Sequence, residues 1–218
     1  MKFEIRGIQF STEELRQLFI SLLVLSFAFS LVLYRNEIFS SGGSFFGNYT
    51  PGFFINSLIV VGLAFILHEE LGHKLVAQRF GYWAEYRTWP TGLFLALIMA
   101  IFSRGSFVFA APGAVVISAH TMFQHVDKEK MGKIAVAGSV VNIILALIFI
   151  GLSLIFTSEL FALGAQVNVW LALFNMIPIG MLDGAKVIRW DRRIWGGVLG
   201  IAIILLLTSG LILTTLAA

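Results

Sequence analysis

The sequence predicts an all-α polytopic membrane protein, with about five transmembrane helices and a membrane-embedded hairpin or short β element at about residues 91–118. Composition is the first observation behind this fold class. Of the 218 residues, 58% are hydrophobic and 12% are charged, whereas a soluble domain carries about 25% charged residues. The second observation is that several segments reach the roughly 20 apolar residues that a helix needs to cross a bilayer.

The N-terminal third predicts a lead-in followed by two spans. Residues 1–14 are charged and amphipathic, with Ser11 or Thr12 as the N-cap of a helix whose first turn is acidic. The first span is predicted at Leu15–Tyr34. The second is predicted at Pro51–Arg79, because proline suits a helix N-terminus and a glycine follows shortly after the end.

The middle of the chain predicts the hairpin. Thr91–Ser103 is apolar but about 13 residues long, which is too short for an ordinary span. Ser106–Ser118 is β-branched and aromatic with a Pro112-Gly113 break, which predicts strand, turn and strand. We expect this segment to enter and leave the membrane on one side. Three further spans are predicted at about 134–157, 161–188 with an interruption at Pro178–Gly180, and 194–216.

The distribution of basic residues predicts the orientation. Of the fifteen Lys and Arg residues, this arrangement leaves only Arg35 in an outer loop and places Arg104 on the inner side. The positive-inside rule then predicts a cytoplasmic N-terminus in a multi-pass protein of the cell membrane. The loop cations account for the net charge of +3, so no nucleic-acid partner is expected. Without a repeat of fixed period, the chain is interpreted as a single domain, 1–218, with its core at about 51–190.

Ionisable side chains inside the second predicted span indicate a metal site. His68, Glu69, Glu70 and His73 lie in an otherwise apolar run, and each charge in hydrocarbon costs roughly 2.5 kcal/mol or more. Histidines that flank carboxylates on one helix are typical of zinc. Asp183, in the interrupted fourth span, lies at a similar depth. Two histidines and one carboxylate leave a fourth zinc position for water, which is the catalytic pattern of metalloproteases.

These motifs resemble those of the site-2 proteases, which are intramembrane zinc metalloproteases. The matching segments are HEELGHK, NMIPIGMLDG and the element from Ala137 to Asn142, AGSVVN, and the similarity covers about residues 61–190. WAEYRTWP and FVFAAPGAVVIS resemble compact archaeal members, so a prokaryotic source is expected. The resemblance implies a transmembrane-protein substrate and one zinc ion held by two histidines and Asp183. It also implies a glutamate as general base, and Asn142 and Asn175 as groups that hold the substrate backbone or the oxyanion.

The two histidines are one residue further apart in this sequence than in the family. The family places them at i and i+4, whereas His68 and His73 are at i and i+5, about 140° apart on a regular α-helix. A π-bulge would bring them together, with Glu69 or Glu70 as the base. Alternatively, a regular helix would pair Glu69 with His73 and leave Glu70 as the base. A third alternative is that the insertion abolishes catalysis.

Two other functional classes compete with an intramembrane protease. A catalytically inactive homologue would bind metal or membrane helices without cutting them. A cation transporter would need a polar path across the membrane, whereas the ionisable residues here cluster at one depth. Asn142 and Asn175 are equally compatible with a role as interhelical hydrogen-bonding residues, and His120 and His125 are interpreted as solvated loop residues. The sequence predicts no oligomeric state.

Overall fold

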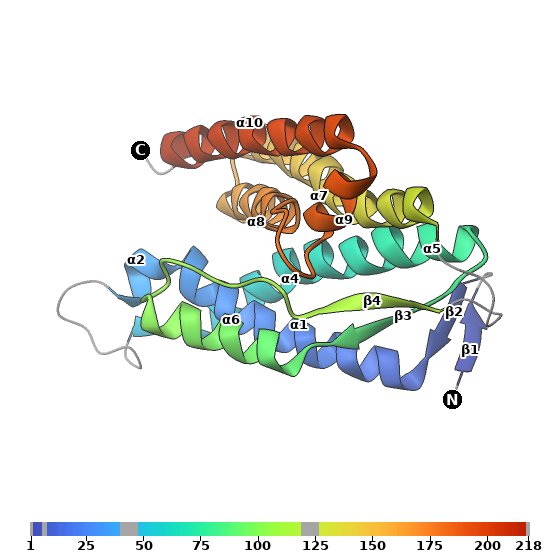
Figure 1. Ribbon diagram of the computed structural model, residues 1–218. Coiled ribbons are helices and arrows are strands. Elements are labelled where there is room, and N and C mark those ends of the chain that lie inside the picture. The colour runs from blue at the N-terminus through green and yellow to red at the C-terminus, as the bar shows by residue number, and fades with distance from the viewer. Residues whose placement is uncertain (1, 6–7, 40–47, 119–126, 217–218) are drawn as a thin grey trace.

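The computed structural model describes residues 2–5, 8–39, 48–118 and 127–216. Most of these residues are helical, and the long helices run along one axis of the molecule in antiparallel succession (Figure 1). The helices are α1 Thr12–Leu33, α2 Arg35–Ile38, α4 Pro51–Leu67, the π-helix η1 His68–Lys74, α5 Leu75–Arg79, α6 Pro90–Phe102, α7 Lys128–Phe156, α8 Glu159–Asn175, α9 Asp183–Trp190 and α10 Arg192–Leu216. The strands are β1 Lys2–Ile5, β2 Ile8–Ser11, β3 Trp83–Thr88 and β4 Gly113–Ser118.

Within the described residues, four helical segments are long and apolar enough to cross a membrane, which confirms the predicted all-α polytopic fold class. They are Thr12–Leu33, Pro51–Arg79, Lys128–Phe156 and Arg192–Gly210. The remaining predicted span, about 161–188 with an interruption at Pro178–Gly180, is present as two helices, and the interruption is wider than predicted, because α8 ends at Asn175 and α9 begins only at Asp183. The segment between the two helices contains Pro178, which lacks a backbone donor, and Gly180, which adopts a positive φ of 59°, so a regular helix does not continue through it.

The helices form layers in which α8 lies at the centre. Figure 1 shows α7 and α10 on one side of α8, α4 on its other side, and α1 with α6 beyond α4. Alanine is frequent where these layers meet, and the fully buried alanines include Ala28, Ala64, Ala96 and Ala146. Small residues let membrane helices approach closely without a hydrophobic driving force between them.

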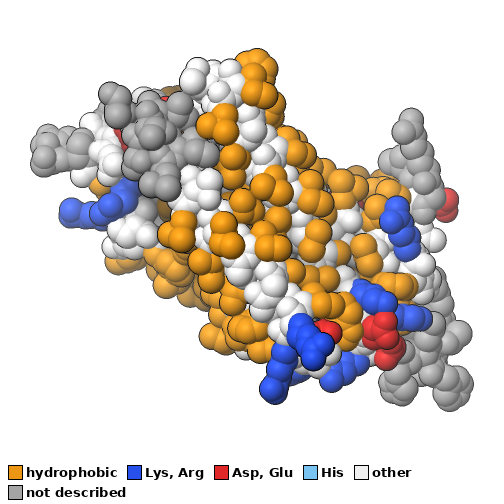
Figure 2. Space-filling model, turned by 90° about the horizontal axis from the view of Figure 1, so that it is seen from above, with side chains coloured by type: hydrophobic (Ala, Val, Ile, Leu, Met, Phe, Trp, Pro, Cys, Tyr) orange, Lys and Arg blue, Asp and Glu red, His pale blue; other side chains and the backbone are white. Residues whose placement is uncertain are grey.

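The outer surface is apolar, as a protein surrounded by lipid requires. Figure 2 shows hydrophobic side chains over the middle of the face that α7 and α10 present, with most of the lysines and arginines of this face toward the lower right of the view. Exposed large apolar residues on these two helices include Ile144, Leu147, Ile148, Ile201, Ile204 and Leu207. This distribution is the reverse of that on a soluble domain.

The segment 83–118 is a hairpin, but its internal structure differs from the prediction. β3 and β4 pair antiparallel, with Trp83 opposite Ser118, so the segment begins and ends at the same end of the molecule. The predicted strand–turn–strand within 106–118 is wrong, since only Gly113–Ser118 is a strand and its partner is the upstream β3. Pro112 has no N–H for a ladder but accepts a hydrogen bond from the Trp89 N–H at 2.7 Å. The apolar run that lies between β3 and β4 forms α6.

The tip of this hairpin reaches the far end of α1. Gly105 approaches the Leu31 carbonyl so closely that an added Cβ would lie 2.0 Å from the oxygen. The Arg35 Nε–H donates to the Arg104 carbonyl at 3.2 Å. Arg104 therefore lies beside Arg35, and its expected place on the inner side with the other basic residues is wrong. The hairpin is longer than its 13-residue apolar run predicts, because the length of β3 adds to that of α6.

The N-terminal lead-in is anchored to the helix that carries the histidines. Ser11 is the N-cap of α1, as predicted, in a capping box with Glu14. Glu14 is fully buried, and its Oε2 lies 2.8 Å from the ammonium of Lys74, which is also fully buried. The same ammonium lies 3.6 Å from the centre of the Phe10 ring. These contacts join β2, α1 and the last residue of η1. His120 and His125 lie outside the described residues.

Candidate metal centre

The extra residue between the histidines is accommodated by a π-helix. Residues His68–Lys74 form η1, a π-helix within an otherwise continuous helix from Pro51 to Arg79. Of the two geometries left open by the spacing, the structure has the π-bulge. In a π-helix, i and i+5 lie on the same face, so the rings of His68 and His73 meet with their centroids 4.6 Å apart.

The helix that carries the histidines packs closely against α7. A Cβ on Gly72 would lie 2.5 Å from the Gly138 Cα, so the two glycines allow the helix backbones to touch. A Cβ on Gly138 would lie 2.5 Å from His73 Nε2 and 2.7 Å from His68 Cε1. Gly138 therefore leaves the space that both imidazole rings occupy.

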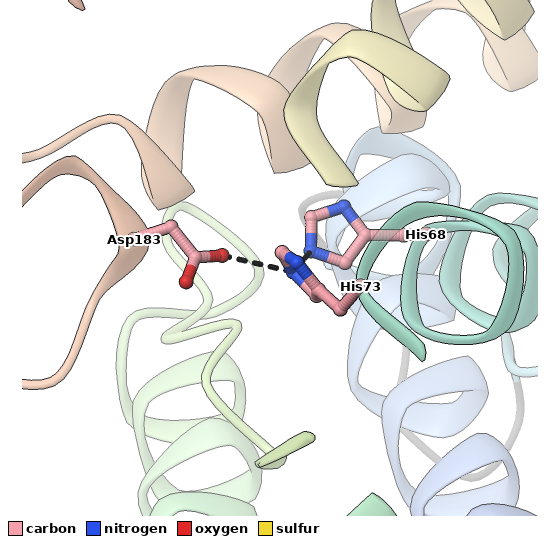
Figure 3. Close-up of side chains that lie close together, drawn as sticks. All are labelled: His68, His73 and Asp183. Atoms are coloured by element: carbon pink, nitrogen blue, oxygen red, sulfur yellow. Dashed lines mark hydrogen bonds and ion pairs between the residues drawn. The ribbon is translucent and has the colours of Figure 1, made fainter. Parts of the chain in front are cut away.

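Three ligand-type atoms converge at this point. His73 Nε2 lies 3.0 Å from His68 Nε2 and 2.9 Å from Asp183 Oδ2. One ligand atom from each residue lies within 4.8 Å of the others, and all three residues are buried. Figure 3 shows that Asp183 reaches the two rings from a segment separate from the helix that carries them. The structure thus brings together the three residues predicted as metal ligands.

The second nitrogen of each ring is held by α7. His73 Nδ1 lies 2.8 Å from the Ile134 carbonyl oxygen; because a carbonyl only accepts, this nitrogen carries the proton. His68 Nδ1 lies 2.7 Å from Asn142 Oδ1 and donates to it in the same way. Both Nε2 atoms are then left with lone pairs, which is the tautomer that binds metal.

Asp183 is positioned by the tight turn that ends α8. It is the first residue of α9, where the helix dipole favours a carboxylate. Gly184 allows this turn, since an added Cβ would lie 2.2 Å from the Met176 carbonyl oxygen. That same carbonyl accepts a hydrogen bond from the Trp195 indole N–H at 2.8 Å. The glycine of the Leu-Asp-Gly motif is therefore required by close packing at the start of α9.

The two glutamates have different surroundings. Glu69 is buried and lines the cavity at the triad, and its Oε2 has no hydrogen-bond partner among the described residues. Glu70 Oε2 instead lies 3.0 Å from the Lys74 ammonium, in an ion pair whose two residues do not line the cavity. The sequence left both residues as candidate bases, and only Glu69 shares a cavity with the triad.

A cavity of about 570 Å³ opens beside the triad. One wall is the run from Phe109 to Ile117, which includes most of β4, and another is the turn from Ile179 to Asp183. The rest of the lining is mainly apolar, and its cationic side chains are Arg87 and Lys186. The cavity is large enough for several residues of an extended peptide.

A comparison with known proteins identifies a relative whose name states a zinc-dependent activity. A protein of Methanocaldococcus jannaschii named "Putative zinc metalloprotease" is 38% identical to this chain over 201 residues, which cover 90% of this chain and 93% of the relative. The chain belongs to this zinc metalloprotease family. No family model and no solved structure matches the sequence.

In this member of the zinc metalloprotease family, the donor atoms fit a zinc ion. Zinc bonds of about 2.0–2.2 Å to nitrogen and oxygen in a tetrahedron place the ligand atoms roughly 3.3 Å apart. Two of the three separations, 3.0 Å between the histidine Nε2 atoms and 2.9 Å from His73 Nε2 to Asp183 Oδ2, are close to that value, and the third is within 4.8 Å. Two converging lone pairs beside a carboxylate oxygen form an electron-rich group that a cation would satisfy. The cavity on the open side leaves room for a fourth ligand.

The two asparagines lie at different distances from the open side of the site. Asn175 lines the cavity, and its Nδ2 is 3.5 Å from His68 Nε2. Asn142 lies behind the His68 ring, and its Nδ2 has no hydrogen-bond partner among the described residues. The predicted substrate or oxyanion role stays a prediction for both, and the geometry gives Asn142 an additional contact with the histidine.

Sequence reasoning missed the residues that orient the ligands. Gly138 and Lys186 carried signals that could have identified them, since Gly138 lies in the AGSVVN element and Lys186 follows Asp183 at i+3 on a helix. The carbonyl of Ile134 carried none, because a backbone group leaves no trace in the residue types.

Proposed function

We propose that this protein is an intramembrane zinc metalloendopeptidase of the site-2 protease type, which hydrolyses peptide bonds in or near the transmembrane helices of membrane proteins. The observation that carries the proposal is the buried group of His68, His73 and Asp183, which converges from two segments of a polytopic helical bundle and faces a cavity. A zinc ion held by these three residues would polarise the scissile carbonyl and acidify a water molecule.

Glu69 is the residue that we assign as the general base. Glu69 lines the cavity, and its Oε2 has no hydrogen-bond partner among the described residues, so the carboxylate has a free oxygen to accept a proton from the attacking water. The same oxygen can then donate that proton to the leaving amine. Glu70 is bound to Lys74 through its carboxylate and is assigned a structural role.

The edge of β4 supplies a surface for an extended substrate. A helical substrate hides its peptide bonds, so it must unwind locally before hydrolysis. In the described part of the chain, β4 pairs with β3 alone, and its residues line the cavity. We therefore propose that the unwound segment adds to β4 as a further strand. We further propose that Asn175, which lines the cavity with its Nδ2 3.5 Å from His68 Nε2, donates to the substrate carbonyl.

The proposed orientation places the metal centre toward the cytoplasmic side. The start of α7, the start of α10 and α5 lie at the same end as the N-terminus (Figure 1), and they carry Arg79, Lys128, Lys130, Lys133, Arg192 and Arg193. The opposite end carries Arg35 and Arg104. The excess of cations supports a cytoplasmic N-terminus, although the correction at Arg104 makes the asymmetry smaller than the sequence indicated.

The test compares Glu69→Gln with Glu70→Gln in proteoliposomes that contain labelled single-span membrane proteins as substrates. Loss of a general base lowers the rate by about 10²–10⁴, so Glu69→Gln should cleave at least about 100-fold more slowly and still contain zinc. Glu70→Gln should stay within about tenfold of the unmodified protein. Cleavage at full rate by both variants would refute the mechanism, and a zinc-containing protein that cuts none of the substrates would identify an inactive homologue.

A further inference from the structure

We infer that Lys186 is a positioning residue that keeps the Asp183 carboxylate a one-oxygen ligand and so preserves the open position at the metal. The inference rests on the proposed function, because it assumes that His68, His73 and Asp183 hold the ion. It concerns a side chain that neither the motifs nor the resemblance assigned.

The two oxygens of Asp183 face different partners. Oδ2 lies 2.9 Å from His73 Nε2, within the triad. Oδ1 lies 2.8 Å from the Lys186 ammonium, which belongs to the next turn of α9. Lys186 is one of the cations that line the cavity, and its side chain is 36% exposed, whereas that of Asp183 is 10% exposed. The carboxylate is thus fixed from both sides.

The separate partners of the two Asp183 oxygens matter because an aspartate can bind a cation through one oxygen or through both. If Oδ1 were free, it could rotate toward the ion and occupy the position that a water molecule needs. A charge-assisted hydrogen bond from an ammonium holds an oxygen more strongly than a neutral donor does. Outer contacts of this kind typically alter metal affinity by 10–100-fold when they are removed.

The alternative explanation is that Lys186 only stabilises α9 through an i,i+3 ion pair. The chain offers a matched control for that explanation. Lys133 forms an i,i+4 pair with Glu129 on α7, and its side chain is 45% exposed. Neither residue of that pair lines the cavity. Lys133→Met therefore removes the same charge and the same kind of helical ion pair, away from the proposed metal.

The experiment measures zinc affinity by competition with a chelator, and the visible absorption of the cobalt-substituted protein, for Lys186→Met, Lys186→Arg and Lys133→Met. Lys186→Met should change zinc affinity by 10–100-fold. Its cobalt bands should lose intensity, because five-coordinate cobalt absorbs more weakly than four-coordinate cobalt. Lys186→Arg should recover most of both properties, since arginine keeps the charged donors. Lys133→Met should match the unmodified protein.

The possible outcomes distinguish a failure of this inference from a failure of the proposed function. If the unmodified protein binds no zinc, the proposed function fails and the inference fails with it. If the unmodified protein binds zinc and Lys186→Met has the same affinity and spectrum, the inference alone is overturned. Equal changes in Lys186→Met and Lys186→Arg, or in Lys186→Met and Lys133→Met, also overturn it. Circular dichroism of each purified variant confirms that the compared proteins are folded.

Discussion

Deletion of one of the two adjacent glutamates tests whether the π-helix is a local accommodation of one extra residue. Removal of Glu70 produces the sequence His-Glu-Leu-Gly-His, with the histidines at i and i+4, and removal of Glu69 produces the same sequence. In a regular α-helix, a deletion rotates everything downstream by about 100° and shifts it by about 1.5 Å. In a π-bulge, the bulge closes and the residues on both sides keep their faces.

The structure gives the expected magnitude for this deletion. If the bulge closes, the imidazole contacts with α7 and the buried Lys74–Glu14 pair survive, and only the Glu70–Lys74 ion pair is lost. We expect a loss of unfolding free energy of about 1–2 kcal/mol and a zinc affinity within about tenfold of the original. If the helix rotates instead, Lys74 loses its partner, which costs about 3–5 kcal/mol for a broken buried pair.

The assay is zinc stoichiometry and chelator competition on detergent-purified protein, with thermal unfolding beside it. A matched control is the deletion of Leu63, a 45% exposed residue in the regular part of α4. No bulge absorbs that deletion, so zinc binding should be lost. If the Glu70 deletion loses zinc as completely as the Leu63 deletion does, the reasoning on the π-helix is refuted.

Three further outcomes are expected. Gly138→Ala should reduce zinc affinity at least about tenfold, because the new methyl group occupies the space of the imidazoles; Gly151→Ala, where nothing lies within 4 Å, should bind zinc normally. Glu14→Gln should lower the unfolding free energy by about 1.5–3 kcal/mol in thermal denaturation, because the buried Lys74 ammonium then keeps Glu70 alone as a carboxylate partner among the described residues, whereas Glu13→Gln on the exposed face should leave thermal unfolding almost unchanged. Chelation of zinc should lower stability by about 2.7 kcal/mol relative to protein with free zinc at 100 times Kd, and unchanged thermal unfolding after chelation would argue against a metal bound to the folded state.

The fold class was accessible from the sequence because lipid imposes a simple rule on composition. A span must be apolar over its length, so the helices α1, α7 and α10 were visible as runs of apolar residues. The break at Pro178 and Gly180 was visible too, but its consequence was underestimated, since the helix ends at Asn175 and does not resume in line. Residue types mark where a helix is interrupted and leave open how the chain continues.

The pairing of β4 illustrates a second limit. The run GAVVIS has the β-branched composition of a strand, and the strand is present. Its partner could not be deduced, because β3 lies upstream of α6 and nothing in the residue types of GAVVIS indicates that it pairs across that helix. The position of Arg104 beside Arg35 could not be deduced either, because it depends on how the tip of the hairpin packs against the end of α1.

The site itself was predictable to the level of side chains but not to the level of geometry. His68, His73 and Asp183 were singled out by their cost in hydrocarbon, and the structure brings them together. The spacing alone left the helix geometry open, since a π-bulge and a regular helix differ by one backbone register. Contacts from α7, through Asn142 and the Ile134 carbonyl, hold the imidazoles in the geometry that the structure has.

The most direct test of the central claim is a crystallographic anomalous difference map of the zinc-loaded protein, collected at the zinc absorption edge. The account predicts one strong peak bonded to His68 Nε2, His73 Nε2 and Asp183 Oδ2, at about 2.0–2.2 Å from each. A peak bonded to Glu69 in place of His68, or zinc bound only away from Asp183, would contradict it.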